Sequence, residues 1–197
     1  MKYLFVIILP YLIGCFSSAY VIGKAFKKID IRNFGSGNVG STNALRVMGA
    51  KLGIFTFLLD ILKGVIAVYL GSFILGENGA LIAGLFVVIG HNWPIFINFK
   101  GGKGVATSIG VLFSLLGTVV LIPLFITFII ILTTKYVSLG SISFLVLVPI
   151  IYGILVKPFY IKFFLLTLVL ALLGVIRHKE NIKRLINKNE SKIKLGR

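Results

Sequence analysis

Apolar runs of membrane-spanning length recur along this chain from one end to the other. A transmembrane helix needs about 20 consecutive apolar residues, and several such runs indicate a polytopic membrane protein. Only 13% of the residues are charged, against roughly 25% in a typical globular domain. The sequence therefore predicts an all-α, polytopic integral membrane protein. The predicted spans are residues 3–22, 52–75, 80–97, two within 105–134, 137–156 and 159–176.

The run 105–134 is too long for one span, and we expect two short spans there. Its 30 residues would extend roughly 45 Å as a helix, whereas the hydrocarbon core is about 30 Å thick. Gly117 and Thr118 lie midway and favour a turn. A second turn is predicted at residues 77–79 (Glu-Asn-Gly). The chain then forms a single seven-helix transmembrane domain, residues 1–197, with its N-terminus outside and its C-terminus in the cytoplasm.

The positions of the positive charges support this orientation. The net charge is +16, and most of the 21 Lys and Arg residues fall in loops or in the tail that seven spans would place inside. Lys2, Lys157 and Lys162 fall outside. Cytoplasmic loops of membrane proteins carry such an excess, so the charge indicates topology rather than a nucleic-acid partner. We expect the first run to be a retained helix and not a signal peptide, because a polar loop and further spans follow it.

Three polar, basic segments interrupt the apolar runs, and all three fall on the predicted cytoplasmic face. They are residues 31–46 (IRNFGSGNVGSTNALR), 99–104 (FKGGKG) and 177–185 (RHKENIKRL). Glycine-rich turns with inward-pointing N–H groups, accompanied by Arg and Lys, are suited to binding phosphate. Alternatively, the charges only mark topology or touch anionic lipid. The candidate binding residues are Gly35, Gly37, Asn38, Thr42, Asn43, Arg46, Gly101, Gly102, Lys103, Gly104 and Arg177.

Two nucleotide-binding patterns in the first segment are chance matches. Its GxGxxG spacing needs a strand before it and a helix after it, and this chain offers membrane spans. Its P-loop spacing has Ser41 where the phosphate-binding lysine must stand. No His, Cys and carboxylate cluster has metal-ligand spacing, and Cys15 is the single cysteine. We therefore expect no metal, no cofactor and no disulfide.

Two histidines and one charged pair are further candidates. His178 and Asn181 are three residues apart and share a face if the segment is helical, which favours a role in the site. His91 ends an apolar run, and it is either a structural histidine or a site residue. Asp60 and Lys63 lie within a span, where charges are costly. They either pair with each other or face a substrate.

The polar segments resemble, in the same order, the three motifs of the bacterial acyl-phosphate:glycerol-3-phosphate acyltransferases, the PlsY family. The matching stretches are GSGNVGSTNALR, GHNWPIFINFKGGKGVAT (residues 90–107) and RHKENIKRL, and DILKG (60–64) is also similar. The resemblance implies a seven-span inner-membrane enzyme without a metal that begins phospholipid synthesis. It would transfer a fatty acyl group from acyl phosphate to the 1-hydroxyl of sn-glycerol 3-phosphate, giving lysophosphatidic acid and phosphate.

The resemblance also implies roles for individual positions. The first motif would supply essential catalytic residues, the second would bind glycerol phosphate, and the third would supply an active polar pair and a structural acid. These residues are Ser36 and Arg46, then Gly101 to Gly104, then His178 and Asn181, and finally Glu190.

We expect direct attack by the glycerol-phosphate hydroxyl, because acyl phosphate is already activated and Cys15 lies too deep in the first span to be a nucleophile. The proton acceptor stays open between His178, His91 and a substrate phosphate. The expected partners are the two substrates and bilayer lipid, with an upstream acyl-phosphate synthase as a candidate protein partner. We expect the chain to act as a monomer.

Two functions from other classes compete with an acyltransferase. A transporter of a phosphorylated solute would need polar residues along a path through the membrane, often in repeated halves. This chain has no internal repeat, and its polar groups gather on one predicted face. A structural protein that recruits partners through a basic face would leave the glycine-rich segments unexplained.

Overall fold

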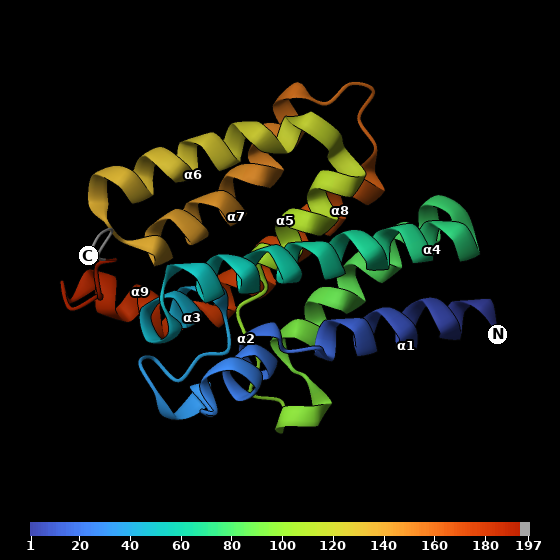
Figure 1. The fold of residues 1–197 in the computed structure, drawn as a ribbon. Helices are drawn as coiled ribbons and strands as arrows, with labels where there is room; N and C mark the ends of the chain where they lie inside the picture. Colours follow the sequence, from blue (N-terminus) through green and yellow to red (C-terminus); the bar gives the residue numbers. More distant parts are fainter. Residues whose placement is uncertain (194–197) are drawn as a thin grey trace. The chain divides into compact units, whose positions relative to one another are not determined.

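The computed structural model describes residues 1–193, and within that range it contains helices and no strand. The predicted all-α class is therefore confirmed. The elements, drawn in Figure 1, are α1 (Lys2–Cys15), α2 (Ser18–Ile22), the π-helix η1 (Gly23–Lys27), the 3-10 helix η2 (Ile31–Asn33), α3 (Ser41–Met48), α4 (Ala50–Asn92), the 3-10 helix η3 (Ile95–Ile97), α5 (Val105–Leu116), the 3-10 helix η4 (Gly117–Val120), α6 (Leu121–Thr134), α7 (Val137–Leu155), α8 (Ile161–Arg177) and α9 (Lys179–Ile186).

The chain folds as two compact units, Met1–Leu115 and Leu116–Arg197. The single transmembrane domain expected from the sequence stays a prediction. Two tail cations that we assigned to the cytoplasmic side, Lys194 and Arg197, lie outside the described residues.

In the first unit, α4 is a hairpin of two helices. At Leu75 and Gly76 the backbone leaves the helical region, and Gly76 takes a φ of 58°, which glycine adopts without a steric penalty. Gly71 and Gly79 then face each other across the hairpin, because a Cβ on either would collide with the carbonyl oxygen of the other. The break thus comes just before the turn predicted at residues 77–79, which belong to the second arm.

Glycines also let α1 and α5 pack closely on the two arms of α4. A Cβ on Gly90, in the second arm, would collide with the carbonyl oxygen of Tyr11 in α1. A Cβ on Gly64, in the first arm, would collide with the carbonyl oxygen of Thr107 in α5. Because lipid tails are as apolar as leucine, close contact through small residues is a main source of helix association in membranes.

In the second unit, α6 packs on α7 and α7 packs on α8, while α9 follows α8 after a bend of 61°. Gly140 of α7 lies against the side chain of Ile131 in α6. Gly174 of α8 lies against the side chain of Leu145 in α7. A glycine therefore lies in both the α6–α7 and the α7–α8 contact.

Four helical stretches of the described residues are long and apolar enough to cross a membrane: Lys2–Lys27, Ala50–Ile97, Val105–Thr134 and Val137–Leu155. A fifth candidate is the bent pair α8 and α9. The second stretch is interrupted at Gly76 and the third at Gly117, where φ is also positive. Divided at these breaks, the stretches and α8 make seven apolar helical segments. That α5 and α6 each cross the bilayer stays a prediction, because they have only 12 and 14 residues.

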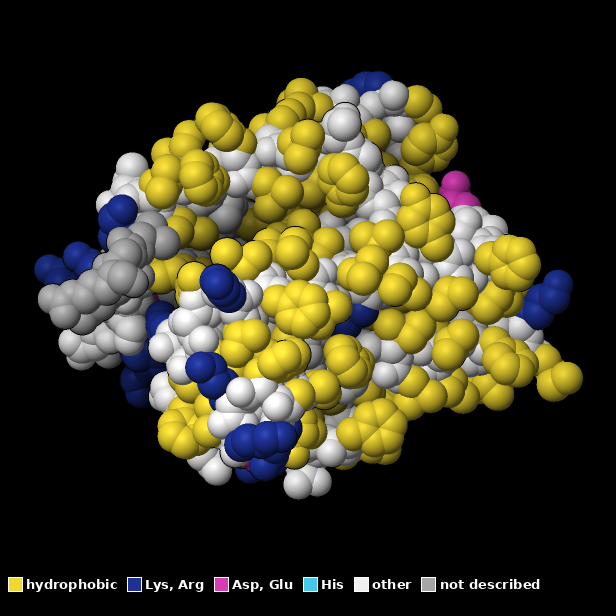
Figure 2. Space-filling view, in the orientation of Figure 1, with side chains coloured by type: hydrophobic (Ala, Val, Ile, Leu, Met, Phe, Trp, Pro, Cys, Tyr) yellow, Lys and Arg dark blue, Asp and Glu magenta, His cyan; other side chains and the backbone are white. Residues whose placement is uncertain are grey.

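Large apolar side chains cover the outer surface of these helices. Figure 2 shows hydrophobic side chains over α1 and α4. Phe73 of α4 is 91% exposed and Phe125 of α6 is 64% exposed. Such a surface is unfavourable in water and suits contact with lipid chains.

Candidate active site

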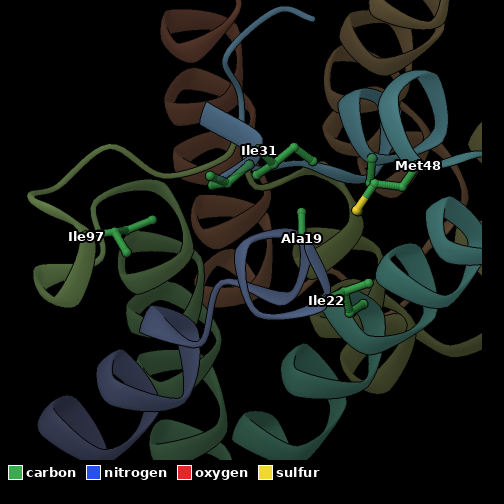
Figure 3. Close-up of a cluster of buried hydrophobic side chains, with 7 residues drawn as sticks. Ala19, Ile22, Ile31, Met48 and Ile97 are labelled. Atoms are coloured by element: carbon green, nitrogen blue, oxygen red, sulfur yellow. The ribbon is translucent and has the colours of Figure 1, made fainter. Parts of the chain in front are cut away.

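The first polar segment packs against a cluster of buried hydrophobic side chains in the first unit. Ala19 and Ile22 from α2, Ile31 and Met48 from the segment and its helix, and Ile97 from η3 are buried in one cluster (Figure 3). Because η3 leads directly into the second polar segment, this cluster holds both segments on the same unit.

Arg32 is fixed at the start of the first segment by Asp30. Nη2 of Arg32 lies 2.7 Å from Oδ2 of Asp30, and the backbone N–H of Arg32 donates to Oδ1 at 3.1 Å. The Arg32 hydrogen bonds lower the pKa of the Asp30 carboxyl to about 2, against the smaller effect of burial. The guanidinium also lies over the Tyr20 ring, 5.0 Å from its centroid. Arg32 therefore shapes the segment, and its charge is balanced.

Asn43 organises the first segment from within. Its Oδ1 accepts a hydrogen bond from the backbone N–H of Ser36 at 2.9 Å, and its Nδ2 donates to three carbonyl oxygens of the segment at 3.0 to 3.4 Å. Gly35 packs directly on this Oδ1, where a Cβ would collide, and both Gly35 and Gly37 have positive φ (60° and 71°). These contacts occupy the Asn43 amide within the loop, so its geometry favours a scaffold role over the substrate contact expected from the sequence.

Asn38 joins the first polar segment to the second. Its Oδ1 accepts from the backbone N–H of Gly40 at 2.9 Å, and its Nδ2 lies 3.4 Å from the carbonyl oxygen of Gly101. Two segments that lie about 60 residues apart in the chain are thereby brought together. The sequence placed Asn38 with the binding residues but gave no sign of this bridge.

The second segment packs against the end of α4 through its glycines. The backbone N–H of Gly102 donates to the carbonyl oxygen of His91 at 3.0 Å. A Cβ on Gly101 would collide with that oxygen, and a Cβ on Gly102 would collide with Nε2 of the imidazole. Gly104 has a φ of 81° and lies against the side-chain amide of Asn92. All three glycines are therefore required for close approach, whatever the ligand.

A buried polar network lies behind this contact. Nζ of Lys63 is 2.9 Å from Oδ1 of Asp60 and 2.8 Å from Nδ1 of His91. Ser18 of α2 donates to the same Asp60 oxygen at 2.8 Å. Asp60 and Lys63 thus form the i,i+3 ion pair that was one of the two readings of the sequence.

The candidate residues that stay accessible in the first unit are the hydroxyl and cationic ones. Ser36 and Arg46 are exposed, and Thr42 and Lys103 are partly exposed. Arg46 lies in the last turn of the short helix α3, which starts beside the glycine-rich turn. This unit therefore carries accessible cations on the same two segments that contain the glycine turns, and this combination suits a phosphate group.

The third polar segment lies in the second unit, at the end of α8 and in α9. His178 is buried, and its Nδ1 is 2.7 Å from the carbonyl oxygen of Gly174. Because a carbonyl can only accept, Nδ1 carries the proton, and in the neutral ring Nε2 then carries the lone pair. Arg177, a candidate phosphate ligand, is the last residue of α8 and is partly exposed.

Glu190 gathers the third segment around its carboxylate. Oε1 accepts from Nδ2 of Asn181 at 2.9 Å and from Oγ of Ser138 at 3.0 Å, and Oε2 accepts from Nε of Arg184 at 2.8 Å. Burial would raise the pKa of this carboxyl, but the three hydrogen bonds outweigh it, so the pKa is lowered from its ordinary value. These contacts fit the structural role that the resemblance implies for Glu190.

Sequence reasoning missed the two serines of these networks. Ser18 and Ser138 lie at the edges of apolar runs, where a hydroxyl is a weak signal because it can also bond to its own helix backbone. It also missed Asn92 and Thr107, whose buried side-chain atoms make no hydrogen bond among the described residues. Within residues 1–193 no group of three His, Cys, Asp or Glu side chains could hold a metal.

Comparison with known proteins decides the family. The family model described as glycerol-3-phosphate acyltransferase matches residues 4–188. The glycerol-3-phosphate acyltransferase of Thermoanaerobacter pseudethanolicus is 50% identical over 94% of this chain and 93% of its own length. That of Alkaliphilus metalliredigens is 45% identical over 96% and 95%. The chain belongs to the PlsY family of glycerol-3-phosphate acyltransferases.

Solved structures of the PlsY family agree with this assignment. The crystal structure of PlsY (YgiH), an integral membrane glycerol 3-phosphate acyltransferase, in its glycerol 3-phosphate form matches with a TM-score of 0.92 and 37% identity, over 98% of this chain and 96% of that one. Its lysophosphatidic acid form matches with a TM-score of 0.89 and 35% identity over the same shares.

Membership of the PlsY family makes this protein an all-helical, multi-pass integral membrane enzyme. Its activity is the acylation of glycerol 3-phosphate to lysophosphatidic acid, a reaction of phospholipid synthesis. The transporter and the partner-recruiting protein are therefore set aside.

Proposed function

We propose that the acyl donor of this enzyme is acyl phosphate and that the acyl group moves in one step. The 1-hydroxyl oxygen of glycerol 3-phosphate attacks the acyl carbonyl carbon, the bond from that carbon to the phosphate oxygen breaks, and inorganic phosphate leaves. No acyl-enzyme is needed, because a mixed anhydride with phosphate is already activated. The motifs shared with the acyl-phosphate-dependent family support this donor.

The accessible groups of the first unit would bind the phosphates. The observation that carries this proposal is the bridge from Asn38 to Gly101, which joins the segment bearing Ser36 and Arg46 to the segment bearing Lys103. Arginine and lysine hold phosphate oxygens by charge-assisted hydrogen bonds, and the glycine turns add backbone donors. Their contribution to the rate is positioning and stabilisation of the charge that develops on the carbonyl and leaving oxygens.

The third motif would act in the same reaction through Arg177, His178 and Asn181. His178 suits a general base because its Nδ1–H is held by a carbonyl, which leaves the lone pair on Nε2. Asn181 would contact substrate while Glu190 orients it. The proton goes to His178 or to a phosphate oxygen of the substrate. His91 is the less suited histidine, because its Nδ1 already lies 2.8 Å from Nζ of Lys63.

We further infer that the site faces the cytoplasm, with the N-terminus outside and the C-terminus inside. The excess of Lys and Arg in the loops and tail on that side supports this orientation. The acyl chain enters sideways from the bilayer between apolar helices. The enzyme acts as a monomer without a metal or another cofactor, in the bacterial inner membrane, and an acyl-phosphate synthase supplies its donor.

A donor comparison tests the proposal. Purified, detergent-solubilised protein is given glycerol 3-phosphate with palmitoyl phosphate or with palmitoyl-CoA, and lysophosphatidic acid is measured. We expect product from the acyl phosphate alone. Product from the CoA ester alone would keep the acyltransferase activity and reject the proposed donor.

A further inference from the structure

We propose that the buried contacts from Ser18 through Asp60 and Lys63 to His91, hereafter the buried relay, position the second polar segment. In this relay His91 is a neutral positioning residue and not the proton acceptor of the reaction. The kinetic part of the inference rests on the proposed function, in which the second segment binds glycerol 3-phosphate.

The relay begins where the first membrane helix is interrupted. α1 ends at Cys15 and α2 begins at Ser18, so the last carbonyl groups of α1 lack the N–H partners of a continuing helix. Nζ of Lys63 donates to the carbonyl oxygens of Gly14 at 3.2 Å and Phe16 at 2.9 Å. A cation at this end also interacts favourably with the helix dipole. Lys63 therefore caps the broken helix from within the first arm of α4.

The charges of the relay balance without His91. The side chains of Lys63 and Asp60 are only 5% and 1% exposed, and their charges meet at 2.9 Å. An unbalanced charge buried at membrane depth is costly, whereas a paired one is tolerated. A protonated His91 would add a second cation 2.8 Å from the Lys63 ammonium. The carboxylate oxygen of Asp60 also faces Nδ1 of His91, but at 3.7 Å, and the same oxygen is already paired with Lys63 at 2.9 Å. The neutral imidazole is therefore the favoured form.

The contact with Lys63 also fixes the tautomer of His91. An ammonium group carries donors and no acceptor, so Nδ1 of His91 accepts and the ring proton lies on Nε2. Nζ has three N–H groups and four partners, so one N–H is shared, and the contact with the Gly14 carbonyl is the longest of the four at 3.2 Å. It is Nε2 that packs on Gly102. In this tautomer the side of the ring that faces the second segment carries a proton and has no lone pair to offer.

His91 then holds the second segment by two contacts. Its carbonyl oxygen accepts from the backbone N–H of Gly102 at 3.0 Å, and its ring leaves no room for a Cβ there. The next residue is Lys103, the proposed phosphate ligand. A shift of the ring would move this segment, so we expect the relay to control the binding of glycerol 3-phosphate more than the rate of acyl transfer.

A spectroscopic experiment tests the tautomer without reference to activity. The chain has only two histidines, so protein labelled with 15N-histidine gives two imidazole spin systems. His91→Asn removes one of them and assigns both. We expect His91 in the wild-type protein at neutral pH to show a protonated Nε2 and an unprotonated Nδ1. An imidazolium, or a ring protonated on Nδ1, would overturn the inference.

Kinetic variants test the positioning role. His91→Asn places an amide oxygen near the position of Nδ1, where it can accept from Lys63, whereas His91→Phe has the ring shape and no acceptor. We expect His91→Phe to raise KM for glycerol 3-phosphate about tenfold with kcat changed by less than about threefold, and His91→Asn to restore most of this loss. A loss of kcat of about a hundredfold in both variants, with KM unchanged, would instead identify a proton acceptor.

Lys63→Met provides a second, independent readout. If Lys63 acts through His91, the double variant Lys63→Met/His91→Phe has a KM no higher than the worse single variant. If the increase in KM in the double variant were the product of the increases in the two single variants, the two residues would act separately, which would contradict the relay. If the acyl-phosphate donor were wrong, all variants and the wild type would be inactive in this assay, whereas the 15N tautomer would still be measured.

Discussion

Nδ2 of Asn181 donates a hydrogen bond of 2.9 Å to Oε1 of Glu190, nine residues further along the chain. The carboxylate is buried and receives two further donors, Ser138 and Arg184. Because a side-chain amide can rotate, this bond fixes the orientation of the Asn181 amide. If Asn181 contacts substrate, as proposed, Glu190 would act by orienting it.

Removal of this carboxylate should lower turnover. In Glu190→Ala the Asn181 amide loses its partner, and we expect kcat to fall about tenfold to a hundredfold, since a misplaced site group costs that much. Glu190→Gln keeps an acceptor oxygen and should lose less. Steady-state kinetics of both variants are compared with Glu180→Gln, an exposed glutamate on α9. Equal activity of Glu190→Ala and the control would contradict the role.

Acid should weaken the third segment through the same group. The pKa of Glu190 is lower in the folded protein than its ordinary value, so its contribution to stability is complete above that ordinary value and is lost as the pH falls through the folded pKa. We expect the melting temperature of the wild type to drop more than that of Glu190→Gln between about pH 6 and pH 4. Parallel curves for the two proteins would show that Glu190 is not linked to folding.

His178→Gln should lower kcat by about a hundredfold or more with little change in KM, if its Nε2 accepts the proton of the attacking hydroxyl. Lys179→Gln, an exposed neighbour, serves as the control. Near-normal turnover of His178→Gln would assign proton acceptance to a phosphate oxygen of the substrate.

Asn43→Ala should destabilise the first unit. The change leaves the Ser36 N–H and three loop carbonyl oxygens without their partner. Only the contact with the Ile31 carbonyl is buried, and water can reach the other groups, so we expect a total loss of about 1 to 3 kcal/mol. Asn43→Asp keeps the acceptor and loses the donors, so it should also be destabilised. Thermal unfolding is compared with Asn33→Ala, an exposed asparagine of η2. If activity fell without any loss of stability, Asn43 would be a substrate ligand and not a scaffold.

The residue types of the candidate site could be predicted from the sequence. Which of them stabilise the loop and which stay accessible to a ligand could not. Glycines, hydroxyls and cations within three short polar segments indicate phosphate binding, because the types of these neighbouring residues are enough to suggest it. The contacts of Asn43 and Asn38 separate a scaffold residue from accessible ones, and they depend on loop conformation that spacing does not encode. Likewise, the partners of Asp60 and Lys63 include the carbonyls of a broken helix, which no pattern marks.

The packing faces of membrane helices are also difficult to predict from sequence. In water a helix shows its buried side as an apolar stripe, but in lipid both sides are apolar, so only glycines hint at contacts. The break in α4 falls at Gly76 rather than at the polar residues 77–79, because the positive φ needs a glycine while polarity only indicates exposure. The break near Gly117 was expected from helix length, and there the backbone also leaves the α-helix at a glycine.

The most direct test of the account is phosphate release from palmitoyl phosphate by the purified enzyme, first without and then with glycerol 3-phosphate. Direct transfer predicts no release above that of a protein-free control until glycerol 3-phosphate is added, and an unchanged intact mass of the protein before its addition. Release then matches lysophosphatidic acid mole for mole. A burst of phosphate equal to the enzyme concentration without glycerol 3-phosphate, together with a mass increase of one palmitoyl group, would show an acyl-enzyme and contradict the account.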